Sequence, residues 1–261
     1  MPLFSIITVC FNSSKTIERT IQSILNQQYK DYEYIIVDGK STDETVKIIK
    51  KYESQFEGRL RWISESDKGI YDAFNKGCKL AKGNYLWIVN SDDWIESNAL
   101  LKLSDIAQEH KSEKCIIAAR MKFHLNNGEI KESPLITKER IEFCAQNYYM
   151  GISHPATIYS KHVYEEIGLY DDRYLISGDL DHFIRCYTNG NIKFITINEF
   201  ITNMSDGGIS NQFNLKKVNH DWNIRYKKFC KNKIEYIKKM YISNYRYIKD
   251  YIHFIMKNDK N

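Results

Sequence analysis

The stretch YLWIVNSDD, residues 85–93, decides the fold. Its first five residues, Tyr85 to Val89, form a continuous apolar run, which is typical of a strand buried on both faces of a parallel sheet. Two adjacent carboxylates, Asp92 and Asp93, follow where this strand ends. Ligands of open α/β sheets bind outside the carboxyl ends of the strands, and carboxylates there can hold a hard divalent cation. The same residues also suit a capped turn, so the rest of the chain must decide between the two interpretations.

Strand and helix patterns alternate along the first ninety or so residues. Apolar strand patterns at 4–10, 32–37 and 60–64 are separated by helical patterns at 16–28, after 41–43 and at 70–82. This alternation predicts an α/β fold with a doubly wound, mostly parallel sheet flanked by helices. Further along, the pattern predicts helices at 97–109, 137–146, 162–167 and 180–188, a hairpin of 115–125 with 129–132, and strands at 154–159 and 192–197.

Polar residues follow each of the four strands predicted in this first part of the chain. They are Asn12, Asp38, the run 65–68, and the pair Asp92 and Asp93. Because the carboxyl ends of parallel strands share one edge, we expect these residues to line one site. Neither G-x-G-x-x-G nor GxxxxGK[ST] is present, which disfavours a dinucleotide dehydrogenase and a P-loop enzyme. A phosphate bound at this edge would need another counter-charge, and a metal held by the two aspartates would supply it.

Several segments resemble glycosyltransferase family 2, whose fold is of the GT-A type. They are SIITVCFN at 5–12, IIVDGKSTDETV at 35–46, and SESDKGIYDAFNKGCKLAKGNYLWIVNSDD at 64–93, which ends in a DXD-type metal motif. Residues 153–174 and 177–190 resemble the acceptor half of the family. The likeness spans about 3–210 and is to bacterial enzymes of polysaccharide, lipopolysaccharide and capsule biosynthesis. It implies a Rossmann-like, mostly parallel sheet flanked by helices. The helical basic C-terminal extension that we also expect lies outside the resemblance.

The resemblance implies a role for each polar residue at the strand ends. Asp38 would accept a hydrogen bond from the nucleotide base, most often from the N3–H of uracil. Asp92 would contact the ribose or the sugar, and Asp93 would bind the Mg²⁺ or Mn²⁺ that bridges the diphosphate and stabilises the leaving group. The nucleotide-sugar site would be completed by Val9, Phe11, Lys68, Asp72 and Asn75. For two of these residues, Asp72 and Asn75, the alternative is that they lie on a solvated helix face.

Inverting transfer needs a general base, which the family takes from an acidic pair just before a helix. Here that place reads Gly178-Asp179-Leu180-Asp181, with glycine where the family has glutamate. We assign the base to Asp179 and take Asp181 as the second candidate, with capping of the following helix as the alternative. His154 would either contact the diphosphate or acceptor, or be a satisfied histidine at a strand end.

Charge is distributed unevenly and divides the chain. Residues 213–261 hold thirteen Lys and Arg against four Asp and Glu, a net +9, while the rest holds 25 against 29, a net −4. We expect a catalytic domain at 1–212, with a nucleotide-sugar half at 1–95 and an acceptor half at 96–212, followed by a basic amphipathic helical tail at 213–261. The tail's apolar stripe would either pack on the catalytic domain or on a second copy in a homodimer, or lie on an anionic membrane.

The expected function is that of an inverting, metal-dependent glycosyltransferase. It would move a sugar from a nucleotide-sugar, with UDP-sugars favoured, to a saccharide or lipid-linked acceptor in surface polysaccharide synthesis. A sugar-nucleotide nucleotidyltransferase is the alternative, but residues 10–14 lack the glycine-rich loop it needs. A nucleic-acid-binding tail is the other class, but no recognition motif is present and no nucleic acid is expected. Without a spanning run or signal peptide we expect a cytoplasmic protein, in contact at most with the inner membrane face, with reduced cysteines.

Overall fold

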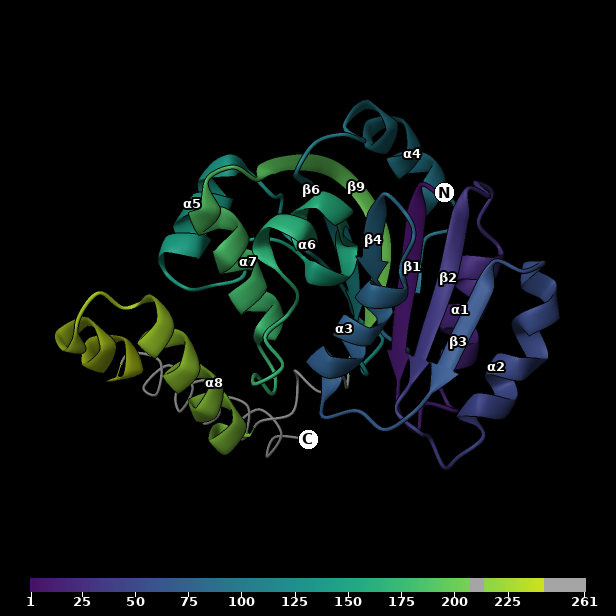
Figure 1. Ribbon diagram of the computed structural model, residues 1–261, viewed down its shortest axis with the longest axis horizontal. Coiled ribbons are helices and arrows are strands. Elements are labelled where there is room, and N and C mark those ends of the chain that lie inside the picture. The colour runs from purple at the N-terminus through teal and green to yellow at the C-terminus, as the bar shows by residue number, and fades with distance from the viewer. Residues whose placement is uncertain (207–213, 242–261) are drawn as a thin grey trace.

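The computed structural model describes residues 1–206 and 214–241 (Figure 1). Four parallel strands form its first half, in the order β3 (Leu60–Ser64), β2 (Tyr32–Asp38), β1 (Phe4–Cys10) and β4 (Tyr85–Ile88). Every residue of β1, β2 and β4 is buried, as the continuous apolar runs predict for strands covered on both faces. Their carboxyl ends meet at one edge, the lower one in Figure 1, which confirms the expected α/β arrangement.

The second half of the sheet continues past β4 with mixed strand directions. β8 (Thr157–Ser160) runs antiparallel to β4, and β6 (Cys115–His124), β9 (Lys193–Ser205) and β5 (Trp94–Ile95) follow in that order. The short strand β7 (Ile130–Glu132) pairs with β6 and forms the expected hairpin. Two details differ from the sequence prediction. The strand predicted to end at 197 extends to 205, and the two-residue strand β5 is too short to carry a detectable period.

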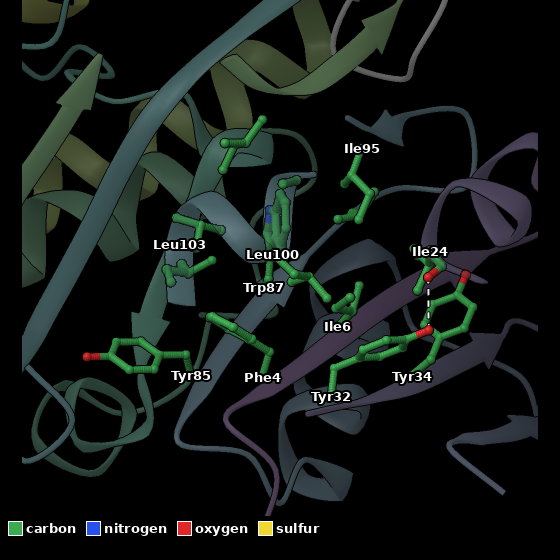
Figure 2. Packing of buried hydrophobic residues seen from close by; sticks show 14 of the residues in the cluster. Phe4, Ile6, Ile24, Tyr32, Tyr34, Tyr85, Trp87, Ile95, Leu100 and Leu103 are labelled. Atoms are coloured by element: carbon green, nitrogen blue, oxygen red, sulfur yellow. Dashed lines mark hydrogen bonds between the residues drawn. The ribbon is translucent and has the colours of Figure 1, made fainter. Parts of the chain in front are cut away.

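Helices cover both faces of the sheet. One face carries α1 (Ile17–Leu25), α2 (Thr45–Glu53) and α4 (Ala99–Glu109), and the other carries α3 (Ile70–Leu80), α6 (Lys161–Ile167) and α7 (Gly178–Asn189). Figure 2 shows the first of these layers, where Phe4 and Ile6 of β1 pack with Trp87 of β4. The remaining described helices are α5 (Lys138–Gln146), α8 (Leu215–Phe229) and a helical segment at 233–241.

The described part of the predicted tail packs on the catalytic body and does not stand apart from it. Helix α8 lies beside α7 (Figure 1), and it buries Asp221, Arg225 and Tyr226. The part of the predicted stripe at 242–261 lies outside the described residues. Within 1–206 and 214–241, no helix is both long and apolar enough to cross a membrane. All six cysteines carry free thiols, and five of them are buried.

Gly77 in α3 gives a stability prediction in which two effects oppose each other. Alanine normally favours a helix interior by about 1 kcal/mol over glycine. A Cβ on Gly77, however, would lie 2.3 Å from the Cγ2 methyl of Ile7 in β1. We therefore expect Gly77→Ala to lower the free energy of unfolding by about 1–3 kcal/mol, because overpacking of a dense core costs that much. Chemical denaturation measures it, with Lys79→Ala on the exposed side of α3 as the control. A stabilised Gly77→Ala protein would contradict the packing described.

Candidate active site

A buried carboxylate without a full set of partners marks the end of β4. Asp93 is 1% exposed, and its Oδ1 accepts a hydrogen bond from the backbone N–H of Ser205 at 3.2 Å. Its Oδ2 is buried with no hydrogen-bond partner, and so is the side-chain oxygen of Asn90 in the same turn. Burial, and then the neighbouring charge of Asp92, raises the pKa of Asp93 to about 8. The Asp93 carboxylate is thus removed from water without a full set of hydrogen bonds, as expected where a ligand completes the site.

Arg19, which the sequence analysis missed, holds the turn in place from helix α1. Its guanidinium donates to the backbone oxygen of Asp92 at 2.8 Å and to the Ser205 hydroxyl at 2.6 Å, and it lies 3.7 Å from the ring centroid of Trp94. Asp92 itself is partly exposed, and burial raises its pKa. Nothing in the helical pattern of 16–28 distinguishes Arg19 from a solvated residue, since its partners lie 73 and 186 positions away.

The residues of this turn fit a divalent cation. Hard cations take oxygen ligands, and Mg²⁺ in particular uses one or two carboxylates together with water and substrate phosphates. The unpaired oxygen of Asp93 and the carboxylate of Asp92 are donors of this kind. Over the described ranges no three His, Cys, Asp or Glu side chains gather at one point. A cation here would therefore need ligands from water or from the substrate.

The structure shows Asp38 in bonds to its own loop. Its carboxylate is fully buried and accepts hydrogen bonds from the backbone N–H of Ser41 at 3.0 Å, from the Ser41 hydroxyl, and from the Ser64 hydroxyl at 2.6 Å. Asp38 therefore orders the loop after β2, and its contact with a nucleotide base stays a prediction. Of the two residues expected near the nucleoside, the Val9 side chain is buried in the core, whereas the Phe11 ring is 63% exposed.

The residues expected from α3 and the loop before it also differ in exposure and in partners. Lys68 is exposed, and its backbone N–H donates to Asp72 at 3.0 Å. That bond, followed by the charge of Lys76 at 3.5 Å, lowers the pKa of Asp72. The Asn75 amide donates to the backbone oxygen of Tyr170 at 2.8 Å and accepts from its N–H at 3.0 Å. Asn75 is partly exposed, and its two bonds with Tyr170 tie α3 to the segment before α7.

Asp179 lies in the first turn of α7, partly exposed. Its Oδ1 is 3.2 Å from the Tyr71 hydroxyl, which also donates to the backbone oxygen of Ile176 at 2.6 Å. The same tyrosine explains the glycine that departs from the family pattern, because a Cβ on Gly178 would lie 2.9 Å from the Tyr71 ring. The helix begins at Gly178, so Asp179 is not the residue that caps it.

Asp181 is not a second candidate for the base. It is fully buried and receives the Arg185 Nε at 2.8 Å, the Lys228 Nζ at 2.7 Å and the Tyr174 hydroxyl at 3.0 Å. A carboxylate held by two cations in the interior is a structural ion pair and is out of reach of a substrate hydroxyl.

His154 opens a 3-10 turn (His154–Ala156), not the predicted strand. It is buried, with Nε2 3.1 Å from the Tyr170 hydroxyl and its ring stacked on Phe74. Burial lowers its pKa. This is the satisfied histidine of the two interpretations.

The unpaired oxygen of Asp93 predicts an increase in stability on neutralisation. The pKa of Asp93 is higher in the folded protein than in the unfolded chain. Ionised Asp93 therefore destabilises the folded protein, an effect that is absent at low pH and grows as the pH rises. We expect Asp93→Asn, in metal-free buffer at pH 9, to raise the free energy of unfolding by about 1–3 kcal/mol, because the neutral amide removes the buried charge. Denaturant titrations at pH 5 and 9 measure it. The exposed Asp105→Asn is the control, and an equal or lower stability of Asp93→Asn at pH 9 would count against the unpaired carboxylate.

Comparison with known proteins connects this site to a family. The sequence model described as Glycosyl transferase family 2 matches residues 5–168, more than half of the chain. A relative from Mycobacterium bovis (strain BCG / Pasteur 1173P2), named PGL/p-HBAD biosynthesis glycosyltransferase, is 28% identical over 212 residues, which cover 80% of each chain. Chondroitin synthase of Escherichia coli is 31% identical over 144 residues, which cover 54% of this chain and 21% of that one.

Solved structures share the fold. TarS 1–349 of S. aureus in complex with UDP-GlcNAc has a TM-score of 0.70 at 21% identity, over 92% of this chain and 69% of that chain. Mannosyltransferase PcManGT from Pyrobaculum calidifontis, in complex with GDP-Man and Mn²⁺, has a TM-score of 0.59 at 14% identity, over 94% and 69%. These likenesses confirm the GT-A type of the curled, mostly parallel sheet. The chain belongs to glycosyl transferase family 2 and is an enzyme that transfers a sugar.

Proposed function

We propose that the chain is an inverting, metal-dependent glycosyltransferase. Its donor is a nucleotide-sugar, most simply a UDP-sugar, and its acceptor is a saccharide or lipid-linked glycan of surface polysaccharide synthesis. The observation that carries the proposal is the buried, unpaired oxygen of Asp93 beside the Asp92 carboxylate at the carboxyl end of β4. The complexes of TarS with UDP-GlcNAc and of PcManGT with GDP-Man and Mn²⁺, which share the fold, support the choice of donor and metal.

On the donor side, Asp92 and Asp93 would hold Mn²⁺ or Mg²⁺. The cation would neutralise the negative charge that develops on the departing nucleoside diphosphate. Arg19 keeps the turn that carries both aspartates in place through its bond to the backbone oxygen of Asp92. The exposed ring of Phe11, at the end of the adjacent strand β1, offers an apolar surface for the nucleotide base.

On the acceptor side, Asp179 acts as the general base. The acceptor hydroxyl gives its proton to Asp179, and its oxygen forms the new bond to the anomeric carbon of the donor sugar. The bond from that carbon to the phosphate oxygen breaks on the opposite face, so the configuration inverts and the nucleoside diphosphate leaves. Asp179 suits this role because it is partly exposed, whereas Asp181 is buried between two cations.

The segment 233–241 supports contact with a membrane. One of its faces contacts the body, since the Tyr236 hydroxyl donates to Asn223 at 2.7 Å and the Lys239 Nζ lies 4.8 Å from the ring centroid of Tyr148. The other face presents an apolar stripe to solvent. The stripe consists of Ile234, Ile237 and Tyr241, which are 79%, 55% and 73% exposed.

Lysines flank this exposed stripe on both sides, with Lys233 on one side and Lys238 on the other at helical spacing. An apolar stripe bordered by lysines is the pattern of a helix that lies on an anionic bilayer. Each basic residue near such a surface contributes about 1 kcal/mol, so a few of them suffice for reversible attachment. We therefore assign this stripe to an anionic bilayer, on which a lipid-linked acceptor would also be found.

Substitution of the base tests the reaction. A panel of nucleotide-sugars is assayed for Mn²⁺-dependent release of nucleoside diphosphate, and Asp179→Asn is then compared with the parent on the donor that is turned over. We expect turnover to fall by about 100-fold or more, because general base catalysis contributes about 10²–10⁴. Calorimetry with UDP and Mn²⁺ should give an unchanged affinity, since only the base is removed.

The matched control for this experiment is Asp181→Asn, which alters a neighbouring carboxylate in the same helix. It should lower the thermal stability of the protein, because it leaves Lys228 and Arg185 without their buried partner. An Asp179→Asn enzyme with parental turnover would remove Asp179 from the mechanism, and a panel without any metal-dependent turnover would count against the proposed function itself.

Vesicle binding tests the exposed stripe. We expect the full chain to co-sediment with vesicles that contain anionic lipid at low salt, not with neutral vesicles, and to be released by high salt. The double variant Ile234→Ser, Ile237→Ser should lose this binding, whereas Leu101→Ser, an exposed leucine on α4, should keep it. Absence of binding to anionic vesicles would withdraw the membrane proposal. A parent that sediments as a dimer which the double variant disrupts would assign the stripe to a second copy instead.

A further inference from the structure

Helix α8 holds the segment that leads into the base-bearing helix α7. The Asp221 carboxylate is 1% exposed and accepts four hydrogen bonds from that segment. The backbone N–H groups of Leu175, Ile176 and Ser177 donate at 2.9, 2.8 and 2.8 Å, and the Ser177 hydroxyl donates at 2.9 Å. One side chain from α8 therefore fixes three consecutive residues that end one position before α7 begins.

These N–H groups need an external acceptor. The residues at and before a helix N-terminus have no carbonyl partner within the helix, and Ser177, which precedes α7, makes no capping bond with its own side chain. A carboxylate that accepts several backbone N–H groups makes short, charge-assisted bonds, which are stronger than those between neutral groups. Asp221 thus satisfies, from 44 to 46 positions away, three backbone donors that precede the helix and that a local N-cap, which accepts from N–H groups of the first helical turn, does not reach.

The contact continues along one face of α8. Arg225, one turn after Asp221, is 2% exposed, and its guanidinium donates to the backbone oxygen of Ser177 at 3.2 Å and to the Ser177 hydroxyl. Lys228, in the next turn, reaches Asp181 in the first turn of α7 at 2.7 Å. Residues four and three positions apart share a helix face. Asp221, Arg225 and Lys228 therefore present one negative and two positive side chains on the same face of α8.

Ile176 connects this contact to the base. Its N–H is held by Asp221, and its carbonyl oxygen accepts from the Tyr71 hydroxyl, which also lies 3.2 Å from the Asp179 carboxylate. The backbone two to four residues before Asp179 is therefore fixed from both sides, by α8 and by α3. Substrate-positioning groups need such support, since a shift of about 1 Å can cost about 100-fold in rate.

We propose that Asp221 and Arg225 are positioning residues for glycosyl transfer. They hold residues 175–177 so that the Asp179 carboxylate meets the reacting hydroxyl. The inference rests on the proposed function in taking Asp179 as the base. It assigns to the basic tail, outside the residues matched to the family at 5–168, an indirect part in catalysis, through the position of Asp179.

The test measures turnover and donor affinity separately for Asp221→Ala, using the UDP-sugar turned over in the panel and calorimetry with UDP and Mn²⁺. We expect turnover at saturating donor to fall about 10–100-fold while the affinity for UDP stays within about twofold, because the donor side is untouched. Ser177→Ala removes only the hydroxyl that both α8 residues contact, and should lower turnover several-fold even if Asp221→Ala fails to fold. Asn223→Ala is the control on the same helix, since its side chain contacts Tyr236 and not this segment.

The outcomes separate this inference from the proposed function. Turnover of both Asp221→Ala and Ser177→Ala within about twofold of the parent, with an inactive Asp179→Asn, overturns the positioning role alone. Equal losses of turnover and UDP affinity in Asp221→Ala also overturn it, because they indicate a general loss of structure. Parental turnover in Asp179→Asn overturns the base assignment, and the positioning role falls with it.

Discussion

A carboxylate oxygen buried without a partner is the constraint around which this enzyme is organised. Asp93 lies in the turn between β4 and β5, where the backbone N–H of Ser205 satisfies one of its oxygens and leaves the other unpaired. Such a group destabilises a folded protein unless something else completes it. The parallel strands, the long strand β9 that brings Ser205 to the site, and Arg19 on α1 keep this turn in place. The cost in stability is concentrated where the proposed cation would bind.

The order of strands and helices in the first half could be predicted, because a doubly wound sheet is encoded locally by periodicity and turn residues. The pair Asp92 and Asp93 could be placed for the same reason. What the sequence could not reveal is which polar groups the protein satisfies by itself. Asp38, Asn75 and Asp181 lie near the expected places, but backbone N–H groups, hydroxyls or cations of the same chain occupy their oxygens.

In the C-terminal part, too, the sequence does not reveal the partners of polar side chains, and here those partners lie farther away along the chain. Its composition predicts a basic amphipathic helical tail, and the described part of it contains the helix α8, which buries Asp221, Arg225 and Tyr226. The charges that matter most there, Asp221 and Arg225, are not distinguished from solvated ones by any local pattern. Their partners lie more than forty residues earlier, in a loop without a motif. Part of the tail, for which packing on the catalytic domain and contact with a membrane are the two interpretations of the sequence, is therefore an internal support of the acceptor side.

The most direct measurement of the central claim is a crystal structure of the enzyme with UDP and Mn²⁺, with anomalous scattering recorded at the manganese edge. We expect an anomalous peak for a manganese ion about 2.0–2.2 Å from the Asp93 carboxylate and the diphosphate oxygens, as for small hard cations. A bound diphosphate with no peak at Asp93, and with the Asp93 oxygen still unpaired or bonded only to protein, would contradict it.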